Sequence, residues 1–288
     1  MGVPLYPFIH IGPLTLGSYG LMVAIGLICA FFILRADFAR RGVSADAEAI
    51  IGITGLAGLA GSRLYHLLQD ENRPEFFDHP VAMLFSTMGF AFVGAIIGGF
   101  VALVILAKRF RMPMLLMLDA ASPAAAMGYG IGRIGCLLSG DGDYGIATNL
   151  PWGVSFQPLQ TGSRILGFIQ IDHGALDPSF GRDVRGLPLD AIVPVHPTPI
   201  YEFLVAILIF WILWRLGARG LKTHAPNGIV FAAYLVFTGI ARFLVEIIRI
   251  NPRSFYGLTN AQAASVVSVL AGVLLFVYCR KAKPEPAR

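Results

Sequence analysis

The sequence predicts an all-α polytopic membrane protein with seven transmembrane helices and a small extracytoplasmic insertion. Of its 288 residues, 56% are hydrophobic and only 14% are charged, and the mean hydropathy is +0.70. A soluble domain carries about 25% charged residues. The basic residues also lie mainly on one side of the apolar stretches, as expected for a chain that crosses a membrane repeatedly.

Seven apolar stretches have the length that a membrane-spanning helix needs, which is about 20 residues. We expect a single membrane domain, 1–288, whose longest connection, 139–197, forms the extracytoplasmic insertion. The runs WGVSF and GFIQI in that connection are typical of short strands. The predicted spans are 16–35, 47–69, 81–107, 114–138, 199–217, 227–249 and 259–279.

The first three spans show features of membrane packing. The first 34 residues contain no Lys, Arg, Asp or Glu, so the basic region of a cleavable signal peptide is missing and we expect this span to remain. Closely spaced glycines in the second span, at 52, 55, 58 and 61, and in the third, at 94 and 98, favour close helix contacts.

The Lys and Arg residues orient the chain, because cytoplasmic loops are enriched in them. Thirteen follow the odd-numbered spans and six lie on the other side, so the amino terminus is predicted outside and the carboxyl terminus in the cytoplasm. The pI of about 9.3 has the same origin, and no nucleic-acid partner is expected. The thirteen are Arg35, Arg40, Arg41, Lys108, Arg109, Arg111, Arg215, Arg219, Lys222, Arg280, Lys281, Lys283 and Arg288.

Apart from the basic residues at the ends of spans, which are assigned to the two sides of the membrane, three arginines lie inside predicted spans: Arg63, Arg133 and Arg242. An arginine at the bilayer centre costs about 2.5 to 3.5 kcal/mol on insertion scales, so each needs a partner. The predicted topology places all three in the outer third of their spans. Guanidinium groups bind phosphate by paired hydrogen bonds. We therefore expect a shared anionic ligand, the phosphate of a phospholipid headgroup.

Carboxylates near these arginines permit a second interpretation. Glu246 and Arg249 follow Arg242 by four and seven residues, which places all three on one helical face. Glu202 lies about one turn into the fifth span. In this architectural alternative, the arginines extend to the outer headgroups or pair with Glu202, Glu246 and Asp119.

The fifth span opens with VHPTPIYEF. We predict Thr198 as the helix N-cap and Pro199 at the first helical position. His196 then lies just outside the helix, and Tyr201 and Glu202 lie in its first turns, as a polar rim of the arginine pocket. The alternative is an ordinary helix start with an interfacial tyrosine.

Five stretches in order resemble the prolipoprotein diacylglyceryl transferase family: LGSYGLM, GSRLYHLL, GIGRIGCLLSGD, VHPTPIYE and GIARFLVEIIR. The resemblance implies a multi-pass protein of the bacterial cytoplasmic (inner) membrane with seven spans. It implies transfer of the diacylglyceryl group of phosphatidylglycerol to the lipobox cysteine thiol of a preprolipoprotein, with release of glycerol phosphate. The implied partners are phosphatidylglycerol, the preprolipoprotein signal peptide and membrane lipids. No metal or organic cofactor is expected.

The resemblance and the arginine argument together select the site residues. By resemblance, Arg133 is the signature arginine, and Tyr19 matches the tyrosine of the first span. The catalytic candidates are Arg133, Arg242, Asp141 and Glu246. The candidates for binding the lipid phosphate are Arg133, Arg63, Arg242, Arg249, Tyr19, His196, Tyr201 and Glu202.

The chain departs from the family pattern at four positions. Cys136 and Ser139 replace two asparagines of the signature, and Asp141 replaces its glutamate. Val93 takes the place of a histidine that is a proposed base in the third span. The thiol proton must therefore go to another group or to water.

Asp141 is the favoured base, because it occupies the position of the signature glutamate. His196, Asp143 and His66 are the alternatives. Two other functions stay open: a family relative with an altered acceptor or lost activity, and a transporter of an anionic solute, which buried arginines alone would permit. The large outside loop and the absence of repeated halves weigh against transport.

Overall fold

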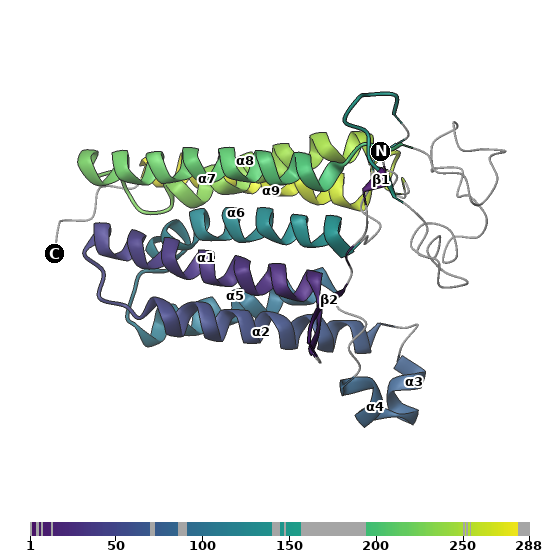
Figure 1. The fold of residues 1–288 in the computed structure, drawn as a ribbon. Coiled ribbons are helices and arrows are strands. Elements are labelled where there is room, and N and C mark those ends of the chain that lie inside the picture. The colour runs from purple at the N-terminus through teal and green to yellow at the C-terminus, as the bar shows by residue number, and fades with distance from the viewer. Residues whose placement is uncertain are drawn as a thin grey trace. The chain divides into compact units, whose positions relative to one another are not determined.

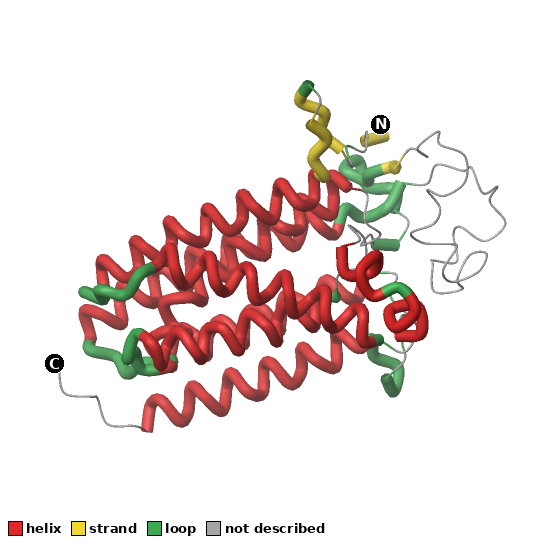
Figure 2. Tube along the Cα trace, turned by 90° about the horizontal axis from the view of Figure 1, so that it is seen from below, coloured by secondary structure: helices red, strands yellow, loops and turns green. Residues whose placement is uncertain are grey.

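The computed structural model describes residues 2–3, 6, 8–12, 14–69, 73–85, 91–139, 145–146, 148–156, 194–249, 251, 253 and 255–281. Within these ranges the chain is predominantly helical, with a few short strands (Figures 1 and 2). The helices are α1 (Ser18–Arg41), α2 (Ala47–Leu68), α3 (Arg73–Asp78), α4 (Pro80–Phe85), α5 (Phe92–Arg109), α6 (Met114–Ser139), α7 (Thr198–Thr223), α8 (Ile229–Ile248) and α9 (Asn260–Lys281).

Six of these helices are long and apolar enough to cross a membrane: α1, α5, α6, α7, α8 and α9. The chain is therefore a polytopic helical membrane protein, as predicted. Helix α2 is also long, with 22 residues, but is not among the six. Its glycines, Arg63 and His66 lower its hydropathy. The seventh span and the outside amino terminus stay predictions.

The described chain divides into two compact units. Unit 1 comprises Met1–Cys29 and Ser122–Arg288, and unit 2 comprises Ala30–Ala121. Helices α1 and α6 each contribute residues to both units. The prediction of a single membrane domain is not tested by this division.

Glycines bring α2 and α5 of unit 2 close together. A Cβ added at Gly98 would collide with the Ala57 carbonyl oxygen, and one at Gly61 would collide with the carbonyl oxygen of Gly94. The close packing predicted from the glycine spacing is confirmed at these positions. At Gly52 the prediction does not hold, because no atom lies within 4 Å of an added Cβ there.

The third predicted span, 81–107, begins later in the structure. Helix α4 ends at Phe85 and α5 begins at Phe92, while residues 86–90 lie outside the described ranges. Ala91 has extended backbone angles, and its N–H donates to the Ser62 carbonyl of α2 at 3.2 Å. Hydropathy did not predict that α5 begins at Phe92, because short apolar segments have a similar composition whether they are helical or extended.

In unit 1, helix α8 packs against α7 and α9 (Figure 1). Helices α6, α7 and α8 contact one another through a hydrophobic cluster. Its buried residues are Ala126, Ile209, Leu213 and Val230. Gly130 of α6 allows the close approach of α7, since an added Cβ would lie 2.7 Å from the Cβ of Ala206. These contacts fix the three helices that carry the candidate site.

Short strands gather at one end of the unit 1 helices (Figure 2). Strand β1 (Gly2–Val3) pairs in parallel with β4 (Ser155–Phe156), and β2 (Phe8–Ile11) pairs antiparallel with β3 (Leu14–Gly17). The end of the predicted WGVSF strand is confirmed as β4. GFIQI and most of the insertion lie outside the described residues.

The predicted N-cap of α7 is wrong by one residue. Pro197 is the N-cap, and Thr198 is the first helical residue. The Thr198 N–H donates to the His196 carbonyl at 2.8 Å, so a turn that includes Pro197 precedes the helix. This shift leaves Tyr201 and Glu202 in the first turns of α7, as predicted.

Candidate functional site

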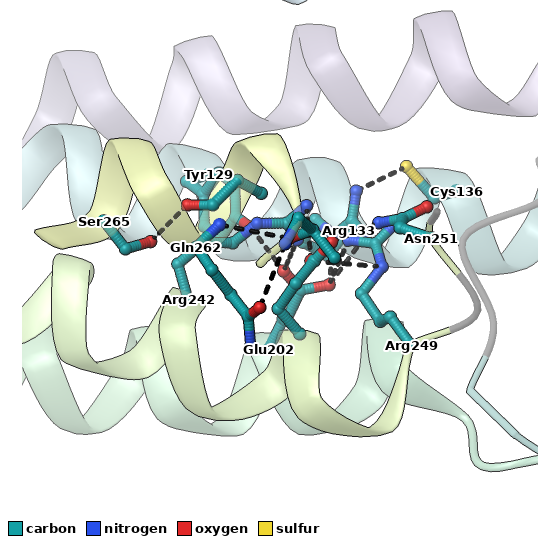
Figure 3. Close-up of polar contacts among 12 residues, drawn as sticks. Tyr129, Arg133, Cys136, Glu202, Arg242, Arg249, Asn251, Gln262 and Ser265 are labelled. Carbon is teal, nitrogen blue, oxygen red and sulfur yellow. Dashed lines mark hydrogen bonds and ion pairs between the residues drawn. The ribbon is translucent and has the colours of Figure 1, made fainter. Parts of the chain in front are cut away.

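Glu202 is the centre of a buried polar cluster in unit 1. Its carboxylate accepts from Arg133 of α6, with the Nε atom 2.8 Å and the Nη2 atom 2.6 Å from Oε2. Arg242 of α8 donates from Nη1 to Oε1 at 2.9 Å, and Nη1 of Arg249 lies 3.7 Å from Oε2. Figure 3 shows these side chains pointing toward one another. Three arginines from two helices thus converge on one carboxylate.

Glu246 supplies a second buried carboxylate to the same cluster. Its Oε2 atom lies 3.1 Å from Nη2 of Arg242 and 3.9 Å from Nε of Arg249. Asn251 donates from Nδ2 to Oε1 at 2.5 Å. The common helical face predicted for Arg242 and Glu246 is confirmed by their ion pair, whereas Arg249 contacts Glu246 from just beyond the helix. Helix α8 ends at Ile248, and Arg249 is its C-cap.

Tyr129 and Cys136 contact Arg133 from its own helix. The Tyr129 hydroxyl donates to Oε1 of Glu202 at 2.6 Å, and its ring centre lies 5.9 Å from the Arg133 guanidinium carbon. Nη1 of Arg133 donates to Sγ of Cys136 at 3.4 Å. Tyr129 precedes Arg133 by four residues and Cys136 follows it by three, so one face of α6 carries all three.

The described residues of the cluster carry charges of both signs. They include three guanidinium groups and two carboxylates in a largely buried setting. The carboxylates offset much of the cost of placing arginines in an apolar environment. The pairing of the arginines with Glu202 and Glu246, which the architectural alternative predicted, is thus present.

His196 and Tyr201, two residues of the predicted polar rim, contact each other. The hydroxyl of Tyr201 accepts from Nε1 of Trp152 at 2.8 Å and lies 3.2 Å from Nδ1 of His196. Trp152 is largely exposed. Trp152 was not predicted from the sequence.

Backbone hydrogen bonds attach the segment after α6 to the ends of α7 and α8. The Gly145 N–H donates to the His196 carbonyl at 3.0 Å, and the Ile146 N–H donates to the Ile248 carbonyl at 2.8 Å. A Cβ at Gly145 would lie 2.6 Å from the Cβ of His196. Only glycine therefore permits this close approach beside the cluster.

Four predicted residues are not part of the contacts described above: Tyr19, Arg63, Val93 and Asp141. Tyr19 of α1 packs beside Gly135, whose added Cβ would lie 3.2 Å from the Tyr19 ring. Arg63 belongs to unit 2, where its guanidinium donates to the Met83 carbonyl. Val93 is an exposed residue of α5. Asp141 lies outside the described residues.

Two residues of the cluster, Tyr129 and Asn251, were missed by the sequence analysis. Tyr129 lies one helical turn before Arg133, and that spacing was the available signal. Asn251 follows α8, where no periodicity indicates its direction. Across the described ranges, no group of three His, Cys, Asp or Glu side chains is arranged to hold a metal ion.

Comparison with known proteins gives a consistent result over nearly the whole chain. The family model described as "Prolipoprotein diacylglyceryl transferase" matches residues 7–278. A Clostridium tetani protein named phosphatidylglycerol–prolipoprotein diacylglyceryl transferase is 30% identical over 268 residues, covering 91% of this chain and 93% of its own. A Geobacter sulfurreducens protein of the same name is 30% identical over 290 residues, covering 97% of this chain and 96% of its own. A third protein of this name, from Corynebacterium glutamicum, is 28% identical over 283 residues, covering 96% of this chain and 83% of its own.

Proposed function

The chain belongs to the prolipoprotein diacylglyceryl transferase family, and we propose that it transfers the diacylglyceryl group of phosphatidylglycerol to the lipobox cysteine of a preprolipoprotein. The relatives' names describe a transferase with these two substrates. They do not favour an anion transporter. The same relationship supports a location in the bacterial cytoplasmic (inner) membrane.

The arginine cluster is the observation that carries the proposal. Arg133 and Arg242 approach one buried carboxylate from α6 and α8, so their guanidinium groups are already oriented toward a common point. Planar guanidinium groups bind phosphate oxygens by paired, charge-assisted hydrogen bonds. In this proposal the lipid phosphate binds to these groups.

The position of the cluster along α7 supports an outward-facing site. Glu202 lies near the start of α7, and Lys222 lies in its last turn. These two residues are about 30 Å apart along the helix, which is the thickness of the hydrocarbon core. Because basic residues mark the cytoplasmic side, the cluster belongs to the outer side. We propose the same orientation for the whole chain, with seven spans and the amino terminus outside.

The chemistry needs a thiolate nucleophile and a stabilised leaving group. The cysteine sulfur attacks the glyceryl carbon that carries the phosphate ester, and the S–C bond forms as the C–O bond breaks. The electron pair remains on the phosphate oxygen, so glycerol phosphate leaves with one additional negative charge. Fixed cations stabilise such developing charge without reorganising. Arg133 and Arg242 take this role, and Glu246 holds Arg242 in place.

The thiol proton requires an acceptor, because the thiolate is the reactive form. Val93 has no group that accepts a proton. We propose Asp141 for this role, since it occupies the position of the family's signature glutamate. Asp141→Asn then lowers turnover strongly at neutral pH and less at high pH, where a cysteine with a pKa of about 8.5 ionises unaided. An equal loss at every pH would assign Asp141 to orientation of the site.

A defined reconstitution tests the function. Purified protein, phosphatidylglycerol vesicles and a lipobox peptide are incubated, and the peptide is measured by mass spectrometry. The expected product carries one diacylglyceryl group on its cysteine. A peptide whose cysteine is replaced by serine is the matched control, and it should gain no mass. No gain on the cysteine peptide by folded protein would reject the proposal.

A further inference from the structure

Tyr129 connects the accessible edge of the site to its buried centre. Its side chain belongs to α6, and the residue is 36% exposed. Its hydroxyl nevertheless reaches into the cluster and donates to Oε1 of Glu202 at 2.6 Å. Tyr129 is therefore partly accessible from outside the cluster while its hydroxyl contacts the buried carboxylate.

Arg242 is the arginine of the cluster that is most open to a ligand. Its side chain is 29% exposed, compared with 11% for Arg133 and 2% for Arg249. Nη1 of Arg242 donates to the same Oε1 atom of Glu202, at 2.9 Å. A hydroxyl and a guanidinium group from two partly exposed residues thus point at one oxygen.

We propose that Tyr129 is a further lipid-binding residue, whose hydroxyl and Arg242 together hold one oxygen of the phosphatidylglycerol phosphate. This inference rests on the proposed function and deepens it. Oε1 of Glu202 accepts both of these hydrogen bonds and thus marks the place proposed for that oxygen. The phosphate approaches from the exposed side formed by Tyr129 and Arg242, and it takes over both hydrogen bonds from the carboxylate.

A hydroxyl suits this position for a physical reason. It rotates freely to follow the acceptor, and it forms short hydrogen bonds to anionic oxygens without adding charge. A fourth cation would add positive charge to the cluster and bind a dianionic product more tightly. Tyr129 therefore adds affinity for the lipid phosphate without changing the charge of the cluster, which the arginines and carboxylates determine.

Steady-state kinetics of Tyr129→Phe test the proposal. The ring is kept and only the hydroxyl is lost, so the KM for phosphatidylglycerol should rise about tenfold, the factor for losing one hydrogen bond to a charged group. The kcat should change less than the KM. Tyr234→Phe is the matched control, because Tyr234 of α8 packs against the hydrophobic cluster of unit 1. Its KM should equal that of the wild type.

The outcomes separate this inference from the proposed function. If the wild type transfers the group and Tyr129→Phe keeps the wild-type KM, or loses only kcat, the assignment of Tyr129 to lipid binding is wrong. If the wild type transfers nothing, the proposed function fails first, and binding is then measured directly.

That direct measurement uses the unaltered protein and avoids any folding defect. Hydroxyl-radical footprinting oxidises accessible tyrosine rings, and peptide mass spectrometry reports the extent at each position. Phosphatidylglycerol should protect Tyr129 several-fold more than diacylglycerol with the same acyl chains, which lacks the phosphate. Tyr256, which is 95% exposed, is the internal reference and should react equally in both. Equal protection of Tyr129 by the two lipids would overturn the proposal.

Discussion

Replacing Glu202 by glutamine removes the carboxylate on which the cluster depends. The Glu202 side chain is 4% exposed and accepts hydrogen bonds from Tyr129, Arg133 and Arg242 at 2.6, 2.8 and 2.9 Å. At about 1.5 to 3 kcal/mol for each bond to a charged group, the three contribute at most about 9 kcal/mol. Glutamine keeps one acceptor oxygen but turns an amide donor toward the arginines. We therefore expect the free energy of unfolding to fall by about 3 to 5 kcal/mol, the cost of breaking a buried ion pair.

Thermal unfolding in detergent micelles, followed by near-ultraviolet circular dichroism, measures this loss. The midpoint of Glu202→Gln should be clearly lower than that of the wild type. Glu48→Gln is the control, since Glu48 is an exposed residue in the first turn of α2, where a carboxylate contributes less than about 1 kcal/mol. Phosphatidylglycerol should restore more of the variant's stability than diacylglycerol does, because its phosphate replaces the missing anion. A wild-type midpoint for Glu202→Gln would refute the role of Glu202 as the counter-ion.

Three further changes test the topology, the guanidinium geometry and the close backbone contact. In intact cells, an impermeant reagent should label a cysteine placed at position 73 and leave one at position 222 unlabelled, and labelling at 222 would contradict the orientation. Arg133→Lys should lower the transfer rate at least about tenfold, because a lysine loses the paired hydrogen bonds, whereas Arg253→Ala, an exposed outer substitution, should retain wild-type turnover. Gly145→Ala should lower the free energy of unfolding by about 1 to 3 kcal/mol through overpacking against His196, and an unchanged unfolding midpoint would show that the backbone shifts without cost.

The helical content and the ionic residues of the site were predictable because they depend on local patterns. Apolar stretches of sufficient length predicted the long helices, and the spacing of Arg242, Glu246 and Arg249 predicted their common face. A buried arginine also needs an opposite charge, so Glu202 was a candidate partner before any contact was known. Sequence reasoning favoured a lipid phosphate as the shared partner and kept pairing with Glu202 as the alternative, because both satisfy the same guanidinium groups.

The missed features depend on contacts between segments that are distant in the chain. Tyr129 became part of the site only because α7 places Glu202 within reach of its hydroxyl. The start of α5 at Phe92 depends on the hydrogen bond from Ala91 to Ser62, which hydropathy does not encode. The one-residue error at Thr198 arose because Pro197 and Pro199 both suit a helix start.

The pairing of Arg133 with Glu202 has a consequence for how the chain is made. The two residues are 69 positions apart. At a synthesis rate of roughly 5 to 20 residues per second, the ribosome adds Glu202 about 3 to 14 s after Arg133. During that interval a nascent α6 contains its arginine before this carboxylate exists. We expect translation intermediates that end before residue 202 to be poorly retained in the bilayer and readily degraded, so that synthesis of the first turn of α7 is the step that commits α6 to the membrane.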